Sequence, residues 1–138
     1  RMPALPDHMT SLEETDEQHP FRMVTAPARS YLNSTFTETP TSIKREQRPT
    51  ALIHPDDCVA LGIVLGDRVE IGNARGSIIV HAKPFDGVQR GVIVIESIWP
   101  NAAFEGGIGV NSLGGADPGA PNGGAAFHDS AVWVRRAV

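Results

Sequence analysis

The sequence predicts a mainly β protein, a closed barrel of short strands with one or two short helices and long loops. Fourteen glycines and eleven prolines among 138 residues indicate many turns and few long helices. Apolar residues make up 41% of the chain, which is enough for one domain with a core of moderate size. The candidate strands carry few features that protect an open sheet edge, and this favours a barrel over a sandwich.

Residues 1–19 are polar and acidic, and we expect a linker or disordered tail ahead of a barrel domain that spans residues 20–138. Ser11 and Glu14 have the spacing of a capping box, which allows one helical turn. An acidic arm that binds a partner is the alternative. The segment contains no apolar stretch of the kind found in signal peptides, so it indicates no compartment.

The first strand is expected at 21–25, where polar and apolar residues alternate before Ala26 and Pro27. A polar segment, 28–49, follows and contains hydroxyls, amides, a guanidinium and two aromatic rings. Long loops with such side chains are often functional. The alternative is a solvated loop whose serines and threonines cap turns.

A short helix is predicted from Pro55 to Gly62, between a strand at 50–53 and a hairpin. The fixed φ of Pro55 suits a first helical position. Asp56 and Asp57 place negative charge in the first turn, where the helix dipole favours it. We expect an apolar face from Cys58, Val59 and Leu61, and a left-handed glycine at the end of the helix.

The remaining strands alternate or are continuously apolar and are separated by glycine turns. The segment 91–95 is continuously apolar, which predicts burial on both faces. The expected strands are 68–71, 77–82, 91–95 and 131–135.

A glycine-rich region, 106–124, lies between the last two strands. It is not a P-loop, because no Gly-Lys-Ser or Gly-Lys-Thr follows, and no strand–helix frame makes it a dinucleotide fingerprint. One interpretation is a surface loop. The other is backbone brought so close to a ligand that a Cβ would collide with it.

Several function classes are disfavoured. A net charge of −4 argues against a nucleic-acid surface, and no apolar run is long enough to span a membrane. The single cysteine excludes an internal disulfide, and the five histidines have no zinc-like spacing. His81 is expected to be satisfied within its strand. No serine stands in a nucleophile elbow, so the chain shows no self-sufficient catalytic site.

Several short stretches together resemble a known family. They are FRMVT (21–25), LNSTF (32–36), HPDDCVALG (54–62), GDRV (66–69), NARG (73–76), RGV (90–92), NSL (111–113) and GGAAFHD (123–129). Their order and spacing resemble the C-terminal cofactor-binding domain of the molybdopterin-dependent oxidoreductases, which include dimethyl sulfoxide reductases, nitrate reductases and formate dehydrogenases. The resemblance covers most of the chain.

This resemblance implies a double-psi β-barrel that binds molybdopterin guanine dinucleotide, as the bis form with molybdenum or tungsten. It implies that the loop after the first strand and the Asn-x-Leu region line the cofactor. Gly114 stands where the family often has threonine, so no hydroxyl is expected there. The cofactor-binding residues that the resemblance implies are Thr25, Asn33, Ser34, Thr35, Asn111, Asp117, Phe127 and His128.

The metal ligand and any iron–sulfur cysteines of that family lie in other domains. The resemblance therefore implies a domain that is inactive alone and whose partners are the remaining domains of a parent oxidoreductase. We expect the isolated domain to be a monomer. The alternative is a stand-alone barrel that recruits a protein or a substrate, since fold does not fix function.

Overall fold

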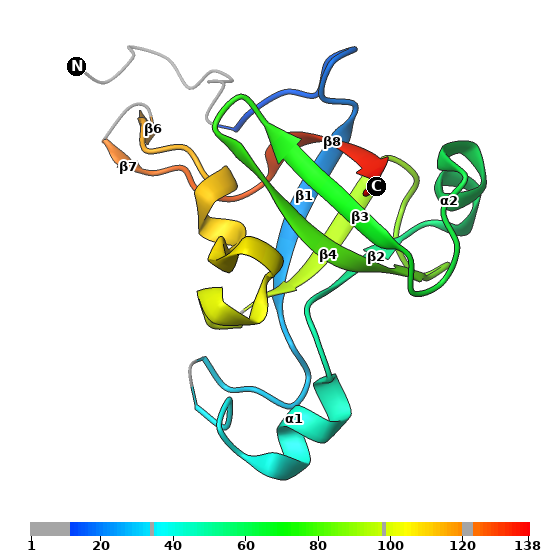
Figure 1. Ribbon diagram of the computed structural model, residues 1–138. Helices are drawn as coiled ribbons and strands as arrows, with labels where there is room; N and C mark the ends of the chain where they lie inside the picture. Colours follow the sequence, from blue (N-terminus) through cyan, green and yellow to red (C-terminus); the bar gives the residue numbers. More distant parts are fainter. Residues whose placement is uncertain (1–11, 34, 98, 120–122) are drawn as a thin grey trace.

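Six strands close into a barrel in the computed structural model, which describes residues 12–33, 35–97, 99–119 and 123–138 (Figure 1). Their order around the barrel is β1-β5-β2-β4-β3-β8. The mainly β double-psi barrel class predicted above is confirmed. The strands are β1 (Phe21–Pro27), β2 (Thr50–Ile53), β3 (Arg68–Asn73), β4 (Gly76–Pro84), β5 (Val92–Ser97) and β8 (Ser130–Arg136).

Two parallel pairings give the barrel its topology. β1 lies parallel to β5, with Met23 opposite Ile93, and β2 lies parallel to β4, with Thr50 opposite His81. The remaining neighbours are antiparallel, and β1 meets β8 to close the ring. Strands distant in sequence are therefore neighbours in the barrel.

Alternate residues of β2, β4 and β5 are buried, as the period-2 pattern requires. β5 departs from its prediction. Ile93 and Ile95 are fully buried, whereas Val92 and Val94 are half-buried, so burial on both faces is wrong. A closed barrel has a single interior, and this strand turns its other face outward. The largest fully buried side chains are Ile53, Val69, Ile71, Ile78, Val80, Ile93, Ile95, Leu113 and Val132.

The predicted helix is present as α2 (Pro55–Leu61). The His54 side chain accepts a hydrogen bond from the backbone N–H of Asp56, and Gly62 ends the helix in the left-handed conformation, with φ of 65°. Cys58 is buried as expected, but Val59 is 81% exposed, so Val59 does not belong to the apolar face.

Asp57 connects α2 to the barrel. Its Oδ2 accepts a hydrogen bond of 2.7 Å from the backbone N–H of Gly91, and its Oδ1 lies 3.2 Å from Nε of Arg90. The carboxylate is buried, whereas the neighbouring Asp56 is exposed. The two aspartates that look alike in the sequence therefore have different structural roles.

A second helix, α1 (Pro40–Glu46), lies within the segment for which the sequence predicts only a loop. It projects from the barrel at the lower end of Figure 1 and has no buried residue. A strained γ-turn centred on Gln47 follows it, because Gln47 has φ of 62° and ψ of −59° and Arg48 N–H donates to the Glu46 carbonyl at 2.7 Å.

Short 3₁₀ turns between residue 101 and residue 113 lead into the glycine-rich region. A small hairpin follows them. The turns and the hairpin strands are η1 (Asn101–Ala103), η2 (Glu105–Gly107), η3 (Val110–Leu113), β6 (Pro118–Gly119) and β7 (Gly124–Ala125). Of these, η2 and η3 pack against β4.

None of the described helices is long and apolar enough to cross a membrane.

Candidate functional site

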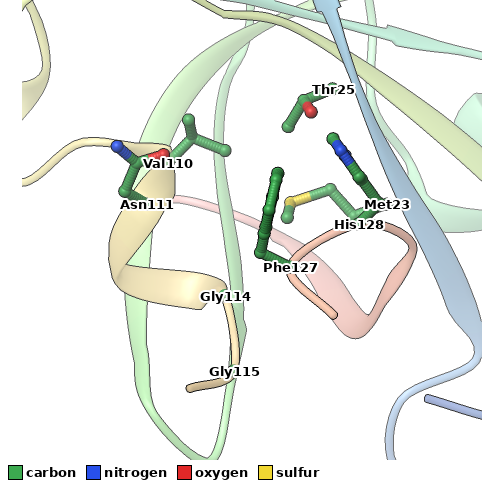
Figure 2. Close-up of a pocket in the computed structure, with 8 residues that line it drawn as sticks. All are labelled: Met23, Thr25, Val110, Asn111, Gly114, Gly115, Phe127 and His128. Carbon is green, nitrogen blue, oxygen red and sulfur yellow. The ribbon is translucent and has the colours of Figure 1, made fainter. Parts of the chain in front are cut away.

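A cavity of about 390 Å³ opens between β1, η3 and the segment just before β8 (Figure 2). Its volume is within the usual range for small-molecule pockets. Residues from three distant parts of the sequence meet there. The lining residues are Met23, Thr25, Val110, Asn111, Gly114, Gly115, Phe127 and His128.

The first wall is η3 and the residues after it. Leu113 is fully buried and fixes this turn to the barrel core. Two backbone bonds keep it compact, because Ser112 N–H donates to the Gly109 carbonyl and Gly114 N–H donates to the Asn111 carbonyl. The Asn111 side chain is exposed on η3, beside the Val110 side chain, which is directed toward Phe127 in Figure 2.

The second wall is formed by Phe127 and His128. Their ring centroids lie 4.3 Å apart with the planes tilted by 47°, and Phe127 is 55% exposed. Asp129 follows with φ of 58°, and its carbonyl accepts a hydrogen bond from the Arg22 guanidinium at 3.3 Å. This turn presents an open aromatic face to the cavity just before β8 begins.

β1 supplies the third wall through Met23 and Thr25. The two residues are two positions apart and therefore project from the same face of the strand. Figure 2 shows both side chains near the rings of Phe127 and His128. Met23 is buried and closes the base, whereas Thr25 is half-buried and brings a hydroxyl.

In the ranges that the structure describes, the lining has neither a carboxylate nor a Lys or Arg side chain. It offers a hydroxyl, an amide and an imidazole, which donate and accept hydrogen bonds, beside an exposed phenyl ring. Such a set suits a flat heteroaromatic group with polar edges. Among the described residues, no cluster of His, Cys, Asp and Glu could hold a metal ion.

Half of the sequence-predicted site residues meet at this cavity. Thr25, Asn111, Phe127 and His128 line it, whereas Asn33, Thr35 and Asp117 do not.

The three that do not line it are all exposed. Asn33 and Thr35 lie in a turn beyond β1, and Asp117 lies just before β6. Ser34 is outside the described residues. Their binding role stays a prediction.

Sequence reasoning missed Met23, Val110 and Gly115 as lining residues. The alternation of β1 would have identified Met23, because a side chain two positions before Thr25 projects from the same face of a strand. Val110 and Gly115 follow from the fold of the 3₁₀ turns, for which the sequence predicts only a loop.

His81 departs from its prediction. Its Nδ1 is buried and has no hydrogen-bond partner in the described part of the chain, so this nitrogen is not satisfied within β4. Burial, followed by the nearby charge of Arg48, lowers the pKa of this imidazole. It lines a cavity of about 280 Å³ together with Arg45, Glu96 and other charged residues.

A larger cavity of about 920 Å³ lies beside α1. Arg29, Arg45 and Lys83 line it together with Glu46 and Glu96, so charges of both signs meet there. None of the sequence-predicted site residues lines it. The candidate site is therefore the cavity of about 390 Å³, at which four of the sequence-predicted residues meet.

Comparison with known proteins gives one family. The family model described as "Molydopterin dinucleotide binding domain" matches residues 21–131. The probable oxidoreductase YoaE of Bacillus subtilis is 38% identical over 97 residues, which are 70% of this chain and 14% of that protein. The dimethyl sulfoxide/trimethylamine N-oxide reductase of Rhodobacter capsulatus is 35% identical over an alignment of 104 residues, covering 67% of this chain and 12% of that protein.

Among solved structures, acetylene hydratase from Pelobacter acetylenicus has the same fold, with a TM-score of 0.73 at 16% identity. The match covers 88% of this chain and 19% of that one. The chain thus spans less than a fifth of the length of each of these proteins.

Proposed function

Because this chain belongs to the molybdopterin dinucleotide-binding domain family, we propose that it binds a molybdopterin guanine dinucleotide cofactor as one domain of a larger oxidoreductase. Residues 20–138 are the binding barrel and residues 1–19 the linker that enters it. The cofactor, in its bis form with molybdenum or tungsten, would supply the redox chemistry. The domain alone has no catalytic role.

The observation that carries this proposal is the meeting of four residues at one cavity. Thr25, Asn111, Phe127 and His128 come from three distant parts of the chain. The sequence motifs identify them without knowledge of the fold, and the barrel brings them together. A surface used only to recruit a protein has no need of this convergence.

The donor set fits one end of such a cofactor. The exposed ring of Phe127 can stack on a pterin or guanine face. The Asn111 amide both donates and accepts, which matches the edge of either ring, and the Thr25 hydroxyl can bond a ring edge or a phosphate. The cavity is the size of an ordinary small-ligand pocket, so we expect it to hold one end of the dinucleotide.

The length comparison supports a parent protein. The chain covers 14% and 12% of the two relatives described above. The remaining domains of a parent would hold the metal, the rest of the cofactor and any electron-transfer centres, and they are the partners that we propose. A stand-alone recruiting barrel is the competing hypothesis.

A titration of the ¹⁵N-labelled chain with guanosine diphosphate tests the site, with adenosine diphosphate as the matched control. We expect amide shifts at residue 25, residues 111–115 and residues 127–128 with the guanine nucleotide. Shifts confined to the α1 side of the barrel, or an absence of shifts, would contradict the proposed site.

A substitution in the full-length protein that contains this chain tests the function. Asn111→Ala should lower cofactor content, because a cofactor group that loses its hydrogen-bond partner on binding is bound more weakly, by about 1–3 kcal/mol. Asn111 lies in η3 and is not among the described non-glycine residues with positive φ, so a left-handed turn role for this residue is excluded. Asn111→Gly should therefore fail to restore cofactor content, and its restoration would overturn the assignment.

A further inference from the structure

Arg75 reaches from the β3–β4 turn to the first wall of the cavity. Its Nε and Nη2 donate to the Leu113 carbonyl at 2.9 and 2.7 Å. Nδ2 of Asn73 donates to the same oxygen at 2.9 Å. Three donors on one carbonyl fix the end of η3, immediately before the cavity residues Gly114 and Gly115.

The same guanidinium binds the segment that precedes β1. Nη2 of Arg75 lies 2.5 Å from Oε1 of Glu13, and the side chains of both residues are 35% exposed. Partial burial and a charge-assisted hydrogen bond make such a pair stronger than an ordinary surface ion pair.

The other oxygen of Glu13 binds the start of β8, three residues after the second wall ends at His128. Oε2 accepts a hydrogen bond of 2.9 Å from the backbone N–H of Ala131, at the start of β8. Ala131 comes just after the cavity residues Phe127 and His128. One carboxylate and one guanidinium therefore join the two walls across the edge of the cavity.

Gly115 lies beside this pair. A Cβ built on Gly115 would have Oε1 of Glu13 at 3.6 Å and Nη1 of Arg75 at 3.8 Å as its nearest neighbours. The ion pair thus borders the cavity itself. Neither of its side chains lines the cavity.

We propose that Arg75 and Glu13 are positioning residues that set the separation of the two cavity walls, and that Glu13 couples the segment ahead of the barrel to the ligand site. Arg75 holds the η3 wall through the Leu113 carbonyl. Glu13 holds the start of β8, which follows the Phe127–His128 wall, and binds Arg75. The ligand assignment in this inference rests on the proposed function, whereas the coupling of the walls does not.

Hydrogen exchange of the 138-residue chain tests the coupling without any ligand. Arg75→Gln should raise the exchange rates of the Ser112 and Gly114 amides about tenfold, because the wall opens locally. Glu13→Gln should raise them less, and the double variant should resemble Arg75→Gln, since the two side chains act as a unit. Arg75→Lys keeps the charge without the forked donors and should give an intermediate rate.

Arg135→Gln is the matched control. Arg135 also pairs with a glutamate on the barrel surface, with Nε 2.7 Å from Oε2 of Glu70, but neither residue lines the cavity. The amides of Ser112 and Gly114 should exchange at the wild-type rate in this variant. Equal acceleration in the control, or none in Arg75→Gln, Arg75→Lys and Glu13→Gln, overturns the proposal.

Guanosine diphosphate affinity separates this inference from the proposed function. If the wild-type chain binds guanosine diphosphate, Arg75→Gln should weaken that affinity about tenfold, whereas Arg135→Gln should leave it unchanged. Faster exchange together with no binding by the wild-type chain would support the positioning role and reject the proposed ligand. Weaker binding with unchanged exchange would reject the positioning role.

Discussion

The two α-helices in the described part of the chain have the same length and both begin with proline, yet their caps and their burial differ. α1 and α2 each contain seven residues and each have proline at the start. α2 has a side-chain cap from His54, a left-handed glycine at its end and two buried residues. α1 has no side-chain cap, ends at the γ-turn of Gln47 and buries nothing.

This difference shows that a helix of this length depends on its surroundings. Seven residues are too few for stable helix formation in water, so tertiary contacts must support them. α2 obtains that support from the barrel through Asp57 and Cys58. Nothing in the described part of the chain buries α1 in the same way. We therefore expect α2 to unfold with the barrel and α1 to unfold locally.

The largest expected effect is at Asp57. Asp57→Ala leaves the Gly91 N–H without its acceptor, so the free energy of unfolding should fall by about 1–3 kcal/mol. Urea denaturation measures the change. Asp56→Ala removes an exposed charge near the helix start and should lower stability by no more than about 0.5 kcal/mol. Equal effects of the two variants would mean that α2 is not tied to the barrel through Asp57.

The helix ends offer the next contrast. Gly62→Ala should lower the free energy of unfolding by about 1 kcal/mol, because alanine strains the left-handed conformation. A Cβ at Gly62 has no heavy atom within 4 Å, so no clash contributes.

Gln47→Gly should relieve the strain of the γ-turn at the end of α1. The Gln47 amide, which donates to the Ile43 carbonyl, should then exchange about fivefold more slowly.

Faster exchange in Gln47→Gly would instead show that the added freedom of glycine outweighs the relief of strain. No change in the urea midpoint of Gly62→Ala would mean that the end of α2 frays before the barrel unfolds.

The third prediction is an effect on stability at alkaline pH that is absent at neutral pH. Burial, and then the charge of Asp57, raises the pKa of the Cys58 thiol above its ordinary value of 9.0. The unfolded chain therefore loses this proton first, and stability is lost as the pH rises above about 9. Urea denaturation from pH 8 to pH 10 should show a decline that is shallower in Cys58→Ala. An identical decline would assign the loss to other groups.

The smallest effect is expected at Ile43, the apolar residue in the middle of α1, which is 42% exposed. Ile43→Ala should change the free energy of unfolding by less than about 0.5 kcal/mol, as for other surface substitutions. A loss above about 1 kcal/mol in urea denaturation would show that α1 packs on the barrel in solution, and the contrast between the helices would fail.

The sequence predicts α2 because its determinants are local: Pro55 starts the helix, Asp56 favours the first turn and Gly62 ends it. α1 could not be predicted, because it has no apolar period and no glycine after it. The β-strands follow from their alternation. The parallel pairings and the outward face of Val92 and Val94 depend on closure of the barrel, which no single segment encodes.

The same distinction applies to the site. Asn111, Phe127 and His128 are identifiable because they stand in short family-like stretches. The partnership of Arg75 with Glu13 and the Leu113 carbonyl joins positions that no sequence spacing relates. Such contacts are set by how the turns pack on the finished barrel, and a single sequence contains no pattern for them.

The pairing of β1 with β8 also determines when the barrel can close during synthesis of the chain. β1 lies between β5 and β8, so the first strand of the barrel to leave the ribosome must wait for the last strand of the barrel before its second edge is paired. Pairings between strands distant in sequence slow folding, because a long loop must close before any contact forms. A nascent chain that stops before residue 130 would expose strand edges on β1 and β3, which are templates for aggregation.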